Sequence, residues 1–270
     1  MRPASRRLVN GTGRLFERGS MVCHCLLVET GDGLVLVDSG LGLADLRDPA
    51  GSLGNLFVRL THPRLDRDET AIRQVTRLGY RPEDVRHIVL THLDPDHAGG
   101  IGDFPWATVH VNATEHEAAT HPPTKAERQR YRSNQWAHDP TWATYGDTGG
   151  ERWFGFEAVR DLRGLPPEIL LVPLAGHTRG HTAVAVDTGD GWLLHAGDAY
   201  FFHGETDPVR RRSTPFLRAF QNLVHVDGPA RKANQARLRE LRAAHDGTVE
   251  VFSAHDEVEL ARYRTGSAVT

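Results

Sequence analysis

The amino-acid sequence predicts an α/β fold, and three observations support this class. Short apolar runs that are typical of buried strands alternate with segments of helical spacing, most regularly over residues 21–111 and 168–256. Several of these runs end just before a histidine or an aspartate, where open α/β sheets place their chemistry. The chain has 270 residues, 39% of them hydrophobic. Because no linker rich in Gly, Ser or Pro divides it, we expect a single domain over residues 1–270.

The first part of the chain is expected to form two strands, a helix and a third strand. Residues 21–29 and 34–40 are apolar runs joined by a Gly-Asp-Gly turn, which predicts a β-hairpin. Residues 1–13 are polar and predict a loose segment or an edge strand. Residues 43–66 contain two prolines and two glycines and predict an irregular loop over the active face. Residues 68–78 carry apolar side chains at helical spacing and end before a glycine.

The middle of the chain interrupts this regular alternation. A short helix is expected over residues 114–119, with Thr114 as its N-cap and Glu117 at the capping-box position. Residues 120–160 mix charged and aromatic side chains with prolines. They are interpreted either as a solvated helix over 125–137 with its aromatic rings in the core, or as a lid insertion whose aromatic rings line a substrate pocket. The interruption favours the lid. The regular pattern then returns in strands at 169–174, 183–186, 192–195 and 249–252 and a helix at 230–244.

The loop after the third strand concentrates side chains that bind metals. His92, Asp94, Asp96 and His97 lie within six residues, directly after the apolar run 87–90. Neither strand nor helix periodicity would gather these four groups on a packing face, so their spacing indicates a functional loop. Asp38 ends an earlier strand beside a glycine. It is interpreted as a ligand, as part of a turn, or as a partner that holds a ligand in place.

Three later strand ends offer further ligands. His177, Asp198 and His255 each follow an apolar run, so four strand ends now carry histidine or carboxylate groups. Zinc and similar metals accept these donors, and catalytic sites keep one position for water. Six or seven ligands exceed what one tetrahedral ion can use. The sequence therefore predicts two divalent ions that share Asp198 as a bridge.

The motifs H-x-D-x-D-H-A-G-G at residues 92–100, G-H-T-R-G-H at 176–181, G-D at 197–198 and the late His255 resemble those of the metallo-β-lactamase superfamily. The resemblance covers residues 20–260 and is strongest to the acyl-homoserine-lactonase-like hydrolases. It implies an α/β fold of four layers, an αββα sandwich with two mixed sheets, helices outside and the metals at one edge.

The resemblance also implies a role for each ligand. His92 and His177 would hold the first ion, and Asp96, His97 and His255 the second, with Asp198 between them. By the same resemblance His181 is structural, along with Thr178 and Gly180.

One residue departs from the family pattern. Asp94 stands where the family has its second histidine. Zinc is the metal expected from the family pattern. Because a carboxylate is a harder ligand with a shorter reach, Asp94 would tighten the first site, leave it to be completed by water, or make iron or manganese the alternative metal. Asp94 is also interpreted as a residue outside the metal shell, or as the N-cap of a helix that starts near Pro95. The sequence leaves these alternatives open.

The expected chemistry is hydrolysis of a carboxylic ester or lactone. Water held between two cations has its pKa lowered to about 7, so metal-bound hydroxide would be the nucleophile. Asp96 or Asp198 would move the proton. Tyr200 is expected either to donate to the substrate oxyanion or to belong to the core. The alternatives are an iron-dependent oxidoreductase of the same fold, or a β-lactam or phosphodiester hydrolase.

Composition limits the partners. A net charge of −3 and a pI near 6.6 give no general attraction to nucleic acid or anionic membranes. Cys23 and Cys25 are spaced so that a strand would point them to opposite faces, which argues against a mutual disulfide. No run approaches the length of a membrane span. We expect a cytoplasmic protein that acts on a small molecule, with monomer or homodimer left open.

Overall fold

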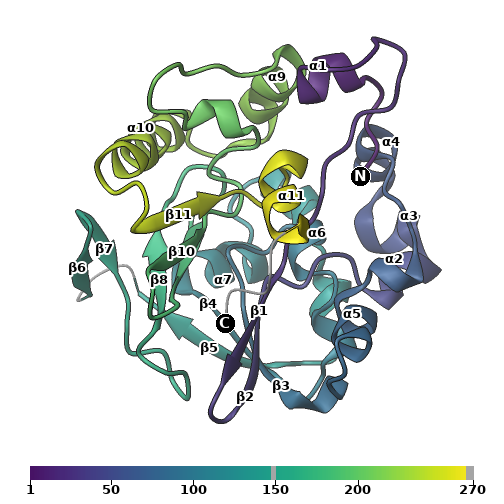
Figure 1. Cartoon of the computed structure of the whole chain (residues 1–270). Coiled ribbons are helices and arrows are strands. Elements are labelled where there is room, and N and C mark those ends of the chain that lie inside the picture. The colour runs from purple at the N-terminus through teal and green to yellow at the C-terminus, as the bar shows by residue number, and fades with distance from the viewer. Residues whose placement is uncertain (147–149, 266–270) are drawn as a thin grey trace.

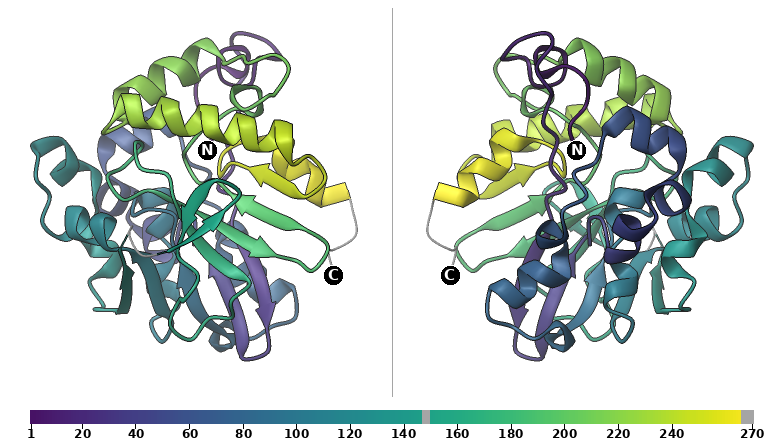
Figure 2. Two further views of the ribbon diagram at one scale, coloured as in Figure 1. Left: turned by 90° about the vertical axis from the view of Figure 1, so that its left-hand side faces the viewer. Right: turned by 90° about the vertical axis from the view of Figure 1, so that its right-hand side faces the viewer.

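Two β-sheets pack face to face at the centre of the protein, and helices cover their outer faces (Figures 1 and 2). A computed structural model describes residues 1–146 and 150–265. The sheets have five and four strands, and a two-stranded ribbon flanks them. This arrangement confirms the predicted αββα sandwich.

The first sheet has the strand order β1-β2-β3-β4-β5. The β1–β2 pair is the expected antiparallel hairpin, and the remaining neighbours are parallel. Consequently the carboxyl ends of β2, β3, β4 and β5 lie at one edge. The strands are β1 (Leu26–Thr30), β2 (Gly33–Val37), β3 (Val85–Val89), β4 (Thr108–Asn112) and β5 (Thr141–Tyr145).

The second sheet has the order β11-β10-β9-β8. Because β9 is antiparallel to both β8 and β10, and β10 is parallel to β11, the carboxyl ends of β8, β10 and β11 share one edge. The strands are β8 (Ile169–Pro173), β9 (Thr182–Asp187), β10 (Trp192–His195) and β11 (Val249–Phe252), and β6 (Glu151–Trp153) and β7 (Phe156–Ala158) form the ribbon.

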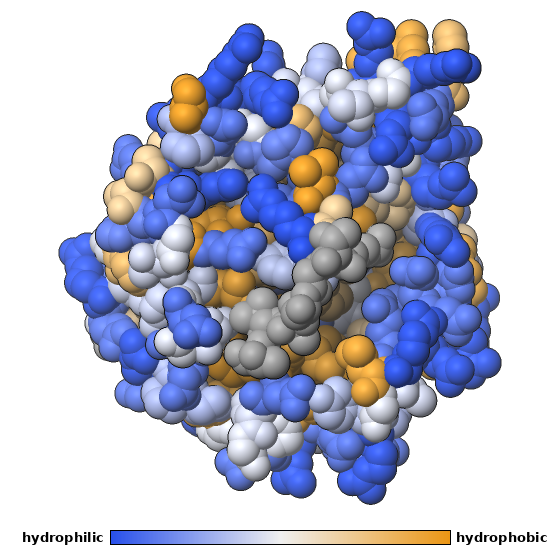
Figure 3. Space-filling view, viewed as in Figure 1, coloured by the Kyte–Doolittle hydropathy of each residue, from blue (hydrophilic) through white to orange (hydrophobic). Residues whose placement is uncertain are grey.

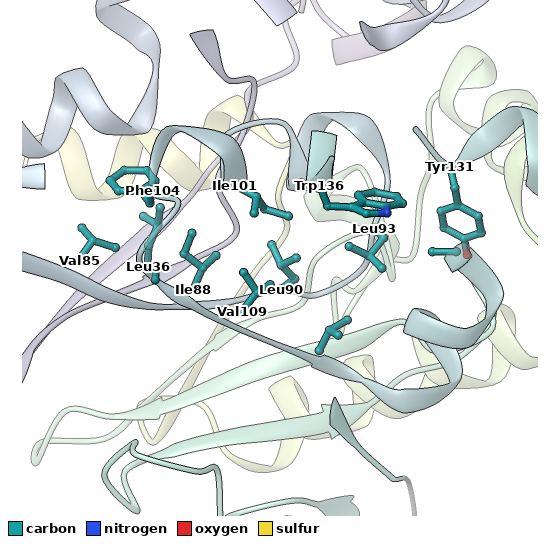
Figure 4. Close-up of a cluster of buried hydrophobic side chains, with 14 of the residues drawn as sticks. Leu36, Val85, Ile88, Leu90, Leu93, Ile101, Phe104, Val109, Tyr131 and Trp136 are labelled. Carbon is teal, nitrogen blue, oxygen red and sulfur yellow. The ribbon is translucent and has the colours of Figure 1, made fainter. Parts of the chain in front are cut away.

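Alternating side chains along the strands build three apolar layers. Leu36 and Ile88 point outward from the first sheet into a cluster that includes Trp136 (Figure 4). Their chain neighbours Val37 and Val89 point inward and meet Leu171 and Val184 of the second sheet. The outer face of the second sheet packs its Leu170 and Val172 against Leu238 and Leu241 of α10. Because these strands are buried on both faces, they appear in the sequence as continuous apolar runs.

Helices lie on both outer faces and around the edge that carries the strand ends (Figure 2). On the face drawn in Figure 3, hydrophilic residues cover most of the surface and apolar ones appear in separate spots. The α-helices are α1 (Arg6–Asn10), α2 (Leu43–Arg47), α3 (Pro49–Leu53), α4 (Asn55–Thr61), α5 (Ala71–Arg77), α6 (Pro95–Ala98), α7 (Ala113–Thr120), α8 (Lys125–Arg130), α9 (Pro215–Val224), α10 (Gly228–Ala244) and α11 (Glu257–Thr265). Short 3₁₀ helices span Arg67–Glu69, Pro82–Asp84, Ile101–Asp103, Ser133–Trp136 and His203–Glu205.

Two predictions for the first part of the chain are wrong. Residues 1–13 are not loose, because Ser5 caps helix α1 and Val9 is buried against α9 and its surroundings. Residues 43–66 are not an irregular loop but contain α2, α3 and α4. The prolines and glycines mark the boundaries of these short helices, with Pro49 in the first turn of α3 and Gly54 between α3 and α4.

The middle segment also differs from expectation. Within residues 120–160, β5 is a strand of the first sheet, and α8 with a 3₁₀ turn replaces the single helix over 125–137. The aromatic rings of Tyr131 and Trp136 are buried in the core, which agrees with the alternative of aromatic anchors and not with the favoured lid. Residues 147–149 of this segment and 266–270 of the expected domain lie outside the described residues. Helix α7 is capped by Asn112, not Thr114. No helix in the described ranges is long and apolar enough to span a membrane.

Candidate metal centre

Four loops at the carboxyl ends of β3, β8, β10 and β11 converge at one edge of the sandwich. Hydrogen bonds hold these loops together, both between the two sheets and within the second sheet. The amide of Thr182 donates to the Thr91 carbonyl at 2.9 Å, and the amide of Asp198 donates to His181 Nε2 at 2.9 Å. His181 therefore positions Asp198 through its backbone, in agreement with the structural role predicted for it.

Four predicted ligands form the first cluster: His92, Asp94, His177 and Asp198. His177 Nε2 lies 3.0 Å from Asp94 Oδ2 and 3.3 Å from Asp198 Oδ2. His92 Nε2 lies 3.4 and 3.8 Å from the same two oxygens. The four donor atoms thus surround a common point.

His97, His255 and Asp198 form the core of the second cluster, and Asp96 joins it through His255, with which Asp96 and Cys23 form an overlapping group. Oδ1 of Asp198 lies 3.3 Å from His97 Nε2 and 3.0 Å from His255 Nε2. His255 Nε2 also lies 3.4 Å from Asp96 Oδ2. Asp198 therefore presents one oxygen to each cluster, as expected of a bridge.

The donor atoms fit metal ions. Ligand atoms at the corners of a tetrahedron are about 3.4 Å apart when each bond is about 2.1 Å long, as in zinc sites. Most distances within the two clusters lie near this value. In addition His92 Nε2, His97 Nε2 and Asp198 Oδ1 are buried with no hydrogen-bond partner in the described structure. Such atoms are costly unless a ligand satisfies them, and a shared cation would do so.

Hydrogen bonds on the far side of the rings aim the histidines inward. His97 Nδ1 lies 2.8 Å from Asp38 Oδ2, and His255 Nδ1 lies 2.6 Å from the carbonyl of Val22. These acceptors fix the proton on Nδ1 and leave Nε2 to face the cluster. Asp38 thus supports His97, which decides among the three interpretations of Asp38.

Asp94 belongs to the first cluster and does not act as a helix cap. It stands at the N-cap position of α6, but its side chain makes no capping hydrogen bond. Its carboxylate instead faces His92 and His177 and pairs with Arg130, whose Nε and Nη2 donate to its two oxygens at 2.5 and 2.6 Å. Arg130 comes from α8 and was not predicted, because nothing in the sequence distinguishes it from the nearby Arg128 and Arg132.

The electrostatics of the site favour cations. Burial tends to raise the pKa of Asp198, but His255, His97 and His177 hold it well below its usual range. Burial likewise opposes the charge on Asp94, and Arg130 holds the pKa of that carboxyl well below its usual range. Both carboxyl groups therefore stay ionised at neutral pH. The ionised oxygens of Asp94 and Asp198 can therefore bind a cation held among the histidines.

Glu115 of α7 ties two metal-bearing loops together. Its carboxylate is fully buried and accepts hydrogen bonds from the amides of Leu93 and Gly180 at 3.0 and 3.1 Å. A Cβ at Gly180 would lie 2.2 Å from the Glu115 amide nitrogen, so the loop needs glycine for this close approach. Sequence reasoning missed Glu115, because its two contacts lie 22 and 65 residues away in the chain.

Two other residues near the clusters, Tyr200 and Cys23, have positions that the sequence did not settle. Tyr200 is fully buried and donates to the carboxylate of Glu259 at 3.0 Å, so it belongs to the core, and the predicted oxyanion role does not fit. The Cys23 thiol lies within 4.8 Å of ligand atoms of Asp96 and His255, a proximity for which the sequence gives no signal. Cys23 and Cys25 are both free thiols.

Comparison with known proteins gives the family. Residues 18–249 match the Metallo-beta-lactamase superfamily. The chain belongs to this superfamily. A "Probable metallo-hydrolase" of Mycobacterium tuberculosis is 49% identical to this superfamily member over 246 residues, which are 90% of this chain and 78% of the relative. An "N-acyl homoserine lactonase" of a Bacillus species is 26% identical over 180 residues, which are 67% of this chain and 64% of the relative.

Solved structures of two lactone hydrolases share the architecture. An N-acyl homoserine lactone hydrolase with N-hexanoyl-L-homoserine bound at its catalytic metal centre superposes with a TM-score of 0.67, covering 97% of this chain and 92% of the other, at 22% identity. The dizinc lactonase AidC superposes with a TM-score of 0.60 at 18% identity, covering 93% of this chain and 78% of the other. At these identities the likeness establishes the fold alone.

Proposed function

We propose that this protein is a metal-dependent hydrolase that cleaves a carboxylic ester or lactone. The observation that carries the proposal is the position of Asp198, whose two oxygens face two separate sets of ligand atoms. Two divalent ions held in this way would activate a water molecule and polarise a carbonyl group. Zinc accepts the histidine and carboxylate donors of both clusters.

A cavity beside the second cluster supports a small acyl substrate. It has a volume of about 210 Å³, and its wall includes His255 and Phe201, whose rings stack with centroids 5.2 Å apart. Met21, Phe202 and Leu217 add apolar surface. Apolar walls beside a polar reaction centre are typical of sites that bind an acyl group. A larger cavity of about 540 Å³ beside β10 and β11 contains no cluster residue, so it is not assigned to the substrate.

The relatives support the choice of a lactone. The Bacillus relative is named an N-acyl homoserine lactonase, and one solved structure of the same fold is a hydrolase that holds N-hexanoyl-L-homoserine at its metal centre. An acyl chain in the cavity would place the adjoining carbonyl beside His255.

Asp96 is the residue we assign to proton transfer. Both oxygens of Asp198 already face histidines, whereas Asp96 makes one such approach, from Oδ2 to His255 Nε2. Asp96 would accept the proton that the attacking water gives up and pass it to the departing oxygen. Asp198 would hold the two halves of the site in register.

The test is a substrate panel on protein of known metal content. Protein purified without added metal is analysed for bound metals, loaded with zinc and assayed with acyl lactones, aryl esters, a β-lactam and a phosphodiester. We expect turnover of lactones or esters to exceed the other two classes by about a hundredfold or more. Asp96→Asn should lower kcat, while the matched control Asp68→Asn, at an exposed position, should not. Preferential β-lactam or phosphodiester turnover would overturn the substrate class.

The second candidate function is iron-dependent redox chemistry. The observation that favours it is Asp94, which gives the first cluster two histidines and two carboxylates, a donor set that iron and manganese also accept. Iron in protein purified without added metal, with visible absorption that changes on reduction and no turnover of esters or lactones, would replace the hydrolase proposal by this one.

A further inference from the structure

The first cluster contains a cation of its own. Arg130 is the last residue of α8, and its side chain, only 14% exposed, extends into the cluster. Its Nη2 lies 2.6 Å from Asp94 Oδ2 and 2.7 Å from His177 Nε2. Its Nη1 donates to the carbonyl of Val224 at 2.6 Å and to the carbonyl of His177 at 3.3 Å, which holds the guanidinium in place.

The guanidinium and a metal ion need the same donor atoms. Asp94 Oδ2 and His177 Nε2 lie 3.0 Å apart and are the atoms through which these residues complete the first cluster. The single lone pair of His177 Nε2 can serve the guanidinium or a metal, but not both. Arg130 keeps its charge at any accessible pH, so only movement of the side chain releases these atoms.

The second cluster has no such competitor in the described part of the chain. There His97 and His255 approach the carboxylates of Asp38, Asp96 and Asp198, and none of these contacts involves an arginine or a lysine. The His97 and His255 rings are held from behind by Asp38 and the Val22 carbonyl, so their Nε2 atoms face the cluster without a competing cation. The two halves of the centre therefore differ in how accessible their donor atoms are.

We propose that Arg130 competes with the metal of the first cluster, so that the two divalent ions bind with unequal affinity and the second cluster fills first. The side chain of Arg130 withdraws from His177 Nε2 when the first cluster takes up its ion. The inference concerns metal loading and rests on the metal centre, not on the identity of the bond that is cleaved.

The test measures metal binding directly in the full chain. Metal-free protein is titrated with Zn²⁺ in competition with a chromophoric chelator, and two dissociation constants are extracted. When introduced alone, His177→Ala should remove the weaker binding step, and His97→Ala should remove the tighter one. Arg130→Met should strengthen the weaker step by about tenfold or more, because it removes a fixed charge from beside the ion.

Two further variants serve as controls. Arg130→Lys keeps the charge and should leave the weaker step near its original affinity. Arg128→Met removes an exposed arginine from the same helix and should change neither constant. Equal constants in the unmodified protein, or an Arg130→Met variant whose weaker step is unchanged or weakened further, would overturn the proposal. If Arg130→Met does not fold, the His177→Ala and His97→Ala titrations still decide whether the weaker step belongs to the first cluster.

Discussion

The stability of this protein should fall as the solution is acidified, and a buried histidine away from the metal centre should account for part of the loss. His110 lies on β4 between the two sheets and is fully buried. Its Nδ1 lies 2.8 Å from the hydroxyl of Tyr145, which accepts the amide of Arg163, so the hydroxyl donates to Nδ1. Nε2 then donates to Nδ1 of His87 at 2.9 Å. Both ring nitrogens are satisfied in the neutral form.

The size of the effect follows from the pKa. Burial, and then the neighbouring His87 and Arg163, lower the pKa of His110 from 6.5 to about 3. As the pH falls below 6.5, His110 becomes protonated in the unfolded chain but stays neutral in the folded protein. The contribution of His110 to the free energy of unfolding is therefore fully present above pH 6.5. It is lost as the pH falls toward 3, at about 1.4 kcal/mol per pH unit. Between pH 7 and pH 5 the loss is about 2 kcal/mol.

The assay is urea unfolding between pH 8 and pH 5 for the unmodified protein and for His110→Gln. The loss at pH 8 measures the packing defect of the variant. We expect the difference between the two proteins to shrink by about 2 kcal/mol on going to pH 5, because glutamine does not titrate. A difference that stays constant with pH would refute the reasoning, as would a His110 ring that titrates near pH 6.5 in the folded protein by NMR.

Three other predictions concern the site and its support. Asp198→Ala should leave less than one metal ion per chain by elemental analysis, since both clusters lose an oxygen; retention of two ions would contradict the bridge. Glu115→Gln should lower the free energy of unfolding in urea by about 1–3 kcal/mol, because a neutral side-chain amide replaces the carboxylate that accepts from two buried backbone amides. An unchanged urea midpoint would show that Glu115 does not stabilise the two loops. Tyr200→Phe should cost about 1–3 kcal/mol of stability through Glu259 yet leave kcat within about twofold; a stable variant with a hundredfold lower kcat would restore Tyr200 to the site.

The ligands of the centre could be predicted because each follows its strand within a few residues. A strand end fixes where the next side chains lie, so His177, Asp198 and His255 could be assigned to one edge before their distances were known. The alternation of inward and outward residues, as in Leu36 and Val37, is also encoded locally.

Contacts that cross the chain could not be predicted in this way. Arg130 meets Asp94 across 36 residues, and no pattern in its own segment marks it. The helices within residues 43–66 were missed for a different reason. Each is only five to seven residues long, too short for a periodic apolar stripe, and their caps use the same glycines and prolines that mark loops. Tyr200 follows Asp198 closely, but the direction of its ring depends on Glu259, which is 59 residues away.

Because Glu115 joins one loop of each sheet, we expect these two loops to respond together to metal binding. The loops that it joins carry His92 and Asp94 from the first sheet and His177 from the second. An ion that drew these ligands together would also hold both loops against Glu115, near the N-terminal end of α7. Metal binding should therefore slow hydrogen exchange at the amides of Leu93 and Gly180 together, and a chelator should release both with a single rate.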